Sequence, residues 1–491
     1  MVDCDAGTIW LDVYDTGNSK KEASCLADTL MDRIRLLEKR GWRVKGCVTD
    51  NAAAELASME LVKEKYEREY KQAFVILTCG LHTASLAQGD LFPWPQERKK
   101  YEEKHGAGNT PWKSFDSWIK AIDLADEISR EHRNRAKLRD QLKKVITGTD
   151  RFRDMKPLMP IQGSTVKMWT RTLVTDRFLQ LHDAILYMLK RQNNKVIKTM
   201  IGEEARPRFH QYIHEMEHNK LAAILKETMG LLLPLYFFQK YCDANYPGSF
   251  VVAYEKWFTM AKETTDAIRK AGGAQVEERI KYWESVLQKR KMMFLTAFHG
   301  AAHILRPSYL LTTSLDAVPG NLKEAFRKAL GEFVKSCPDK QQRVIEAMAV
   351  WSSMLQKTDR YQLLDDAGEQ HAMWAEADEL CDNGSKDKSW WQMHIGSAAG
   401  DSKGLYEFVQ HLLDLRVSEA GCERAFSVIS HVGDGRDQLS HNKLQQLTHI
   451  YWGHRTLQSD HTRRRLLKLQ AMTQTPAQDL DGDIEEDFDE A

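Results

Sequence analysis

The chain has 491 residues, 42% hydrophobic and 29% charged, a balance typical of a folded protein with two or three domains. Seventy lysines and arginines match seventy aspartates and glutamates, so no overall positive field argues for nucleic acid, and any DNA-binding surface must be a local patch. The longest apolar run, residues 230–238, is too short to span a bilayer, and no signal segment opens the chain. We therefore expect no membrane partner.

The cysteines are scattered, and none forms a C-x-x-C pair. This spacing predicts reduced, intracellular thiols rather than a disulfide framework, and it excludes a zinc finger of the ordinary kind. The eight positions are Cys4, Cys25, Cys47, Cys79, Cys242, Cys337, Cys381 and Cys422.

Residues 1–92 alternate between strand and helix patterns. Strands are predicted over 8–14, 42–49 and 74–77, and helices over 20–40 and 52–66. This order implies parallel strands joined by right-handed crossovers, with functional groups gathering at the C-terminal strand ends. Asp50 follows the second strand, and Cys79 and His82 follow the third. Asp50 is a candidate metal-binding carboxylate. Cys79 and His82 alone are more often core residues, because two side chains do not make a four-ligand site.

The middle of the chain has helical periodicity. Residues 93–109 are polar and predict a linker, and helical stripes then dominate from 114 to about 380. Dispersed tryptophans are expected to fill the core of this part. They are Trp118, Trp169, Trp257, Trp283, Trp351 and Trp374.

Three apolar helical stripes follow one another between residues 390 and 457, which predicts self-association through exposed apolar surface. The interface residues expected from them are Trp390, Trp391, Leu405, Phe408, Phe426, Leu444, Leu447 and Ile450. Ser418 is placed to cap the middle helix. Glu423 lies beside that helix's apolar face, which suits metal binding or a buried pair, and an ordinary ion pair with Arg424 is the alternative.

The last residues lose all periodicity. Residues 473–491 are acidic and apolar-poor, which predicts disorder. The preceding run Arg463, Arg464 and Arg465 is either a nuclear signal or phosphate contact, or simply a solvated helix face.

Together these motifs resemble the hAT family of DNA transposases. V-T-D-N-A-A-A (48–54) and C-G-L-H-T-A-S-L (79–86) are similar to the family's catalytic-domain pattern. The Trp-Trp pair, C-E-R-A-F-S (422–427) and the later R-x-x-L-S are similar to its C-terminal dimerisation region, over about 70 residues. The zinc-binding DNA reader that many members carry is not in this chain.

The resemblance implies roles for particular residues. Asp50 matches the family's second catalytic acid and Glu423 its third, and both would hold Mg²⁺ or Mn²⁺ if the chain is active. Cys79 and His82 would lie near the active edge. Arg171 and Arg177 are rival matches to an Arg-Trp pair and hence candidate DNA contacts, although an Arg here is by default a solvated helix residue.

The expected fold is α/β plus a large all-α insertion, with an incomplete ribonuclease H-like parallel or mixed sheet. We expect an α/β part lacking its first strand over 1–92, a helical insertion over 110–385, the dimerisation region over 388–460 and the acidic tail over 473–491. The family's first acid belongs to an Asp-Gly-Trp motif on that first strand. Asp3, Asp5, Asp12 and Asp15 do not sit in such a motif.

The sequence therefore predicts a transposon-derived protein that is not an enzyme, forms homodimers or higher oligomers, and contacts DNA. We expect it in the nucleus, with the cytoplasm as the alternative. The alternative function is an active DNA transposase whose zinc finger and first catalytic strand are missing from this sequence. A helical scaffold of unrelated ancestry is the third option.

Overall fold

The computed structural model describes residues 2–4, 7–9, 22–50, 52–106, 108, 110–155, 158–161, 170–191, 195–218, 220–243, 250–335, 337, 339–364, 372–379, 384–396, 403–418, 443 and 447. Glu423, Phe426, Leu444, Ile450 and the acidic tail therefore lie outside the described residues. The chain divides into two units, Met1–Ser19 with Gly421–Ala491, and Lys20–Ala420.

The first unit contains a short hairpin. Strands β1 (Val2–Cys4) and β2 (Gly7–Ile9) pair antiparallel, with Val2 opposite Ile9. Strand β2 includes the first two residues of the strand predicted over 8–14, and residues 10–14 lie outside the described residues.

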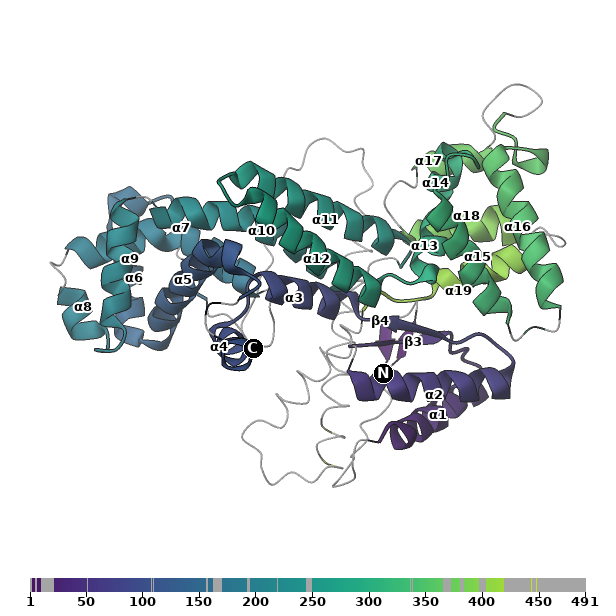
Figure 1. The fold of residues 1–491 in the computed structure, drawn as a ribbon, viewed down its shortest axis with the longest axis horizontal. Helices are drawn as coiled ribbons and strands as arrows, with labels where there is room; N and C mark the ends of the chain where they lie inside the picture. The colour runs from purple at the N-terminus through teal and green to yellow at the C-terminus, as the bar shows by residue number, and fades with distance from the viewer. Residues whose placement is uncertain are drawn as a thin grey trace, which may run out of the picture. The chain divides into compact units, whose positions relative to one another are not determined.

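The second unit begins with an α/β part. Its elements are α1 (Ala23–Lys39), β3 (Gly46–Thr49), α2 (Ala53–Tyr70) and β4 (Val75–Thr78). The two strands pair parallel, with Gly46 opposite Val75 and Thr49 opposite Thr78. Helices α1 and α2 lie side by side along this sheet (Figure 1). The predicted alternation with parallel strands is confirmed for these elements.

Strand β3 is shorter than the strand predicted over 42–49. The segment before it folds back on α1, because the Trp42 amide donates to Leu37 O at 3.1 Å and the Val44 amide to Glu38 Oε1 at 2.9 Å. Gly46 then lies so close to β4 that a Cβ there would be 2.2 Å from Val75 O. A side chain at this position would disrupt the strand pair.

Helices fill the next part of the chain around one hydrophobic core, which includes the buried Trp118, Trp257 and Trp283. The elements are α3 (Gly80–Leu91), α4 (Pro95–His105), η1 (Lys113–Phe115), α5 (Asp116–Asn134), α6 (Ala136–Gly148), η2 (Asp150–Phe152), α7 (Thr170–Arg191), α8 (Lys195–Met200), α9 (Arg206–Glu217), α10 (Lys220–Asp243), α11 (Phe250–Ala271) and α12 (Val276–Phe294).

Helix α4 corrects the linker predicted over 93–109. Pro95 stands at the start of the helix, where its missing N–H costs nothing, and the Trp94 amide donates to Glu97 Oε2 at 2.9 Å. The helix buries no residue, so it shows no apolar period in the sequence.

A second core holds the remaining helices together with Val75 and Leu77 of β4. The elements are α13 (Ala297–Ile304), α14 (Pro307–Thr312), α15 (Gly320–Val334), α16 (Lys340–Gln356), η3 (Asp359–Tyr361), α17 (Ala372–Glu379), α18 (Gly384–Trp391), the π-helical turn η4 (Gln392–Gly396) and α19 (Lys403–Leu413). Trp351 and Trp374 are buried in it, so the predicted role of the tryptophans is confirmed except for Trp169, which lies outside the described residues.

Helix α10 is the one described helix long and apolar enough to cross a membrane by length and composition. Half of its apolar window is buried inside the protein, and it packs against α3, α7 and α11. This is the behaviour of a core helix. The described chain is mostly helical with a small parallel sheet, which confirms the expected combination of an α/β part and a large helical part.

Candidate functional site

The ends of β3 and β4 lie next to each other and bring Asp50 to Cys79. The Cys79 amide donates to Thr49 O at 2.7 Å, extending the parallel pairing by one bond beyond the strands. Asp50 Oδ1 accepts from the Ala52 amide at 2.8 Å, and this turn leads into α2. The structure therefore brings together the two sequence motifs that suggested a site here.

An acid that the sequence reasoning missed lies at the same edge. Glu55 Oε2 accepts from Thr49 Oγ1 at 2.7 Å, and Thr49 is buried. The position of Glu55 in the first turn of α2, shortly after Asp50, could have indicated from the sequence that it lies at this edge.

Cys79 and His82 differ in their surroundings. Cys79 is fully buried and caps α3, its Sγ accepting from the His82 amide at 3.5 Å. His82 is half-buried, and burial lowers the pKa of its imidazole below 6.5. The Asp50 carboxylate opposes that shift and the Arg290 guanidinium adds to it. Cys79 is thus a structural residue, whereas the His82 imidazole interacts electrostatically with the Asp50 carboxylate.

The segment before the C-terminal motif is anchored at this edge. The Gly80 amide donates to Val417 O at 2.8 Å, and Ser418 Oγ donates to Cys242 O at 2.5 Å. Val417 and Ser418 are both buried. The helix that Ser418 was predicted to cap lies outside the described residues.

The metal expected from the resemblance needs more ligands than the described residues offer. Among them, no group of three or more His, Cys, Asp or Glu side chains could hold a metal ion. Two divalent cations require several converging carboxylates, and Asp50 with Glu55 does not make such a set.

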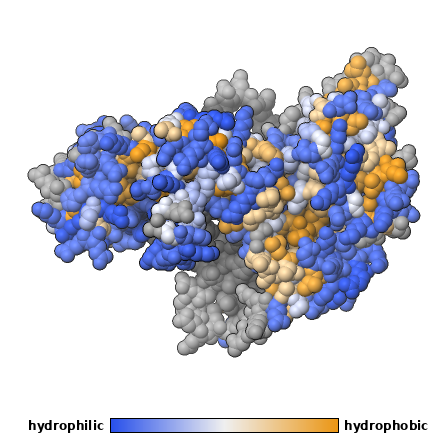
Figure 2. Space-filling model, viewed as in Figure 1, coloured by the Kyte–Doolittle hydropathy of each residue, from blue (hydrophilic) through white to orange (hydrophobic). Residues whose placement is uncertain are grey.

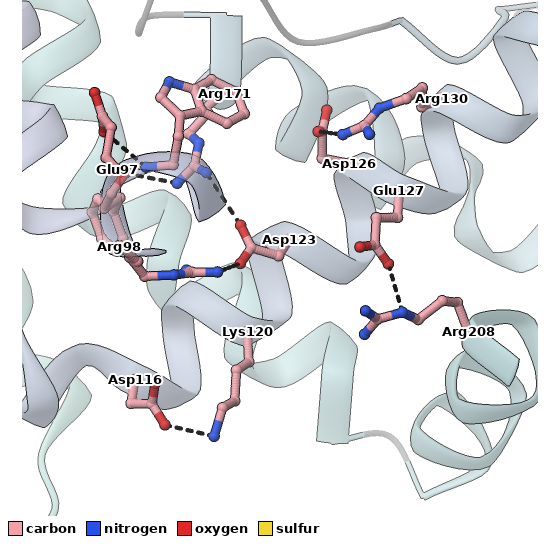
Figure 3. Close-up of polar contacts among 12 residues, drawn as sticks. Glu97, Arg98, Asp116, Lys120, Asp123, Asp126, Glu127, Arg130, Arg171 and Arg208 are labelled. Atoms are coloured by element: carbon pink, nitrogen blue, oxygen red, sulfur yellow. Dashed lines mark hydrogen bonds and ion pairs between the residues drawn. The ribbon is translucent and has the colours of Figure 1, made fainter. Parts of the chain in front are cut away.

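The prediction that Arg171 contacts DNA is wrong, because its guanidinium is buried. Its Nη1 donates to Phe92 O at 2.7 Å, its Nη2 lies 3.1 Å from Asp123 Oδ1, and the group stacks 3.8 Å from the centre of the Trp94 ring. Arg98 contacts the same Asp123 carboxylate (Figure 3). Burial lowers the pKa of Arg171 to about 10, so it stays charged at neutral pH.

Arg177 keeps part of its side chain at the surface. It is half-buried, and its Nη1 donates to Met159 O at 2.8 Å. Its proposed DNA contact stays a prediction.

The predicted interface role is also wrong for four residues. Trp390, Trp391, Leu405 and Phe408 are at most 2% exposed, because they belong to the second core of this chain. The indole N–H of Trp391 donates to Leu305 O at 3.1 Å. Leu447 is 37% exposed, while Phe426, Leu444 and Ile450 lie outside the described residues.

No model of a known protein family matches the chain, and no curated protein matches it either. The resemblance to hAT transposases therefore rests on the motifs themselves.

Proposed function

We propose that this chain is an hAT-like, transposon-derived protein that self-associates through its C-terminal region and contacts DNA in the nucleus without cutting it. Its α/β part is proposed to be a ribonuclease H-like sheet in incomplete form. The hydrogen bond between Gly80 and Val417 carries the proposal, because it joins the first hAT-like motif to the segment that directly precedes the second one in the sequence.

The proposed self-association rests on residues after Ser418. The apolar residues of the earlier helices, such as Trp391 and Phe408, are buried in the second core and are not available to a partner. Phe426 and Leu447 are the apolar residues of the motif region best placed to anchor a partner by type and spacing. A second copy of the chain is the proposed partner.

Light scattering on the purified chain tests the proposal. We expect a dimer or larger oligomer at micromolar concentration, and dissociation by the double substitution Phe426→Asp and Leu447→Asp. Phe237→Asp is the control, because Phe237 is 61% exposed on α10 and outside the region. A monomeric wild-type chain, or equal dissociation by the control, would contradict the proposal.

A further inference from the structure

The neutral chain contains one strongly basic stretch. Residues 130–226 hold 21 lysines and arginines and ten aspartates and glutamates, although the two kinds are equal over the whole sequence. A local positive field of this kind attracts polyanions even when the net charge is zero.

The stretch folds into adjoining helices, so its charges share one region of the surface. Helix α6 packs against α7, α8 and η2. The Phe152 ring of η2 meets the Tyr187 ring of α7 at 5.5 Å between centroids. Figure 2 shows predominantly hydrophilic residues over α6, α8 and α9, which Figure 1 labels.

Several of these cations are exposed and make no ion pair with a described residue. They are Arg133, Lys137, Lys143, Lys144 and Arg151. Neighbouring arginines differ: Arg130 pairs with Asp126 at 2.7 Å, and Arg208 with Glu127 at 3.1 Å (Figure 3). The charge of the first group is therefore free to meet an external anion.

A recess lies within the same region. It has a volume of about 360 Å³ and is lined by Arg151, Asp183, Leu186, Tyr187 and Lys190. Arg151 and Lys190 supply two exposed cations, and Tyr187 supplies an aromatic ring. Asp183 is the acid among the lining residues, and its carboxylate lies 3.2 Å from the His182 ring. Lysine and arginine side chains beside a recess can contact successive phosphates of a nucleic-acid backbone.

The surface chemistry favours nucleic acid over a membrane or a protein partner. Among the described residues of 130–226, no large apolar side chain is exposed. Binding at a membrane interface needs an apolar face, and protein interfaces need apolar or aromatic anchors. A polar surface with unpaired cations is instead typical of backbone contacts to nucleic acid.

We propose that the face formed by α6, η2 and the C-terminal half of α7 binds the phosphate backbone of duplex DNA without reading its sequence. Lys137, Lys144 and Arg151 are the phosphate contacts. This inference deepens the DNA-contact part of the proposed function and rests on it.

The test uses the full chain and a labelled DNA duplex of mixed sequence, followed by fluorescence anisotropy over a series of salt concentrations. The charge variant is K137Q/K144Q/R151Q. The control is R327Q/K328Q/K340Q, which removes the same number of lysines and arginines from two exposed positions on α15 and one at the start of α16. Light scattering on both variants checks that self-association is unchanged.

We expect the charge variant to lose about tenfold or more in affinity near physiological salt, and to lower the slope of log K against log salt by about 2 to 3. The control should stay close to wild type. Equal weakening by both variants, or by neither, would overturn the surface while leaving DNA contact by the wild-type chain intact. Duplex RNA bound at least as tightly as DNA would overturn the assignment to DNA. A wild-type chain that binds no DNA would contradict both this inference and the DNA contact in the proposed function. Self-association would still be tested independently by light scattering.

Discussion

The Gly80 amide and the Val417 carbonyl oxygen are 2.8 Å apart, a hydrogen bond that joins the start of α3 to the last described segment of the second unit. Gly80 also lies close to α10 and α12, because it has no side chain. A Cβ there would lie 2.9 Å from the Phe294 ring and 3.0 Å from Cys242 Sγ. The close packing of α3 against α10 and α12 at this point thus requires a glycine.

Gly80→Ala should destabilise the protein, because the neighbouring ring and sulfur atom must shift to admit a methyl group. The expected cost is about 1–3 kcal/mol, measured by urea unfolding. Gly148→Ala is the matched control, since a Cβ there meets no atom within 4 Å. Equal losses of stability in both variants would contradict the packing described for Gly80.

Arg171→Leu should lower the free energy of unfolding by about 3 kcal/mol or more, because it leaves Phe92 O and the half-buried Asp123 carboxylate without the Arg171 guanidinium. Arg98 still contacts Asp123, which limits the loss. Arg177→Leu removes a half-buried side chain that donates one hydrogen bond, to Met159 O, and a loss of about 1 kcal/mol is expected. Urea unfolding of the two variants decides between them. A larger effect at Arg177 would show that Arg171 is not the structural residue.

Asp387 should make the stability depend on pH. Burial raises the pKa of its carboxyl group to about 7, although the Arg306 guanidinium opposes the shift at 4.0 Å between Nε and Oδ2. The folded state therefore holds the proton more tightly than the unfolded state, whose pKa is 3.8. The resulting stability is full below pH 3.8 and is lost as the pH rises to about 7.

Asp387→Asn should abolish this contribution and stabilise the protein at pH 8 by about 2–4 kcal/mol, since each pKa unit is about 1.4 kcal/mol. Buried histidines act in the opposite direction: burial lowers the pKa of His299 to about 3, so their contribution is lost on acidification. Thermal unfolding of wild type and Asp387→Asn is measured at pH 5 and pH 8. The difference between the two proteins in their change of stability with pH is the contribution of Asp387. A variant with the same pH dependence as wild type would contradict the assignment.

Trp391→Ala should destabilise the chain by about 3–5 kcal/mol without changing its state of association, because the indole fills the second core rather than an interface. Thermal unfolding and light scattering on the same sample measure the two effects. Dissociation of the oligomer while the stability stays at the wild-type value would restore Trp391 to the interface.

The chain should not nick DNA in the presence of magnesium or manganese. The sequence offers Asp50 and Glu423 and no third acid in the motif that the family uses, and a two-metal site with a ligand missing loses both charge and geometry. A nicking assay on a hairpin or terminal-repeat substrate compares wild type with Asp50→Asn and Glu423→Gln. Metal-dependent cleavage that both substitutions abolish would show the chain to be an active transposase.

Local patterns in the sequence were sufficient for elements whose own residues decide their structure. The apolar spacing that gives α1 its buried Ile34 and Leu37, and the β-branched run of β4, could be read directly. Parallel pairing of β3 and β4 followed from the helix between them. Helix α4 could not be read this way, because its stability comes from capping and charged residues and not from an apolar stripe.

Tertiary structure decided which of the suggested side chains are buried and which face solvent. Arg171 and Trp391 were expected to meet a partner at the surface, yet both are buried and donate to carbonyl oxygens of distant segments, at Phe92 and Leu305. The same holds for the juxtaposition of Gly80 with Val417 and for the cations left unpaired on α6. A hydrophobic period or a motif depends on residues a few positions apart, whereas burial and ion pairing depend on segments brought together only when the chain folds.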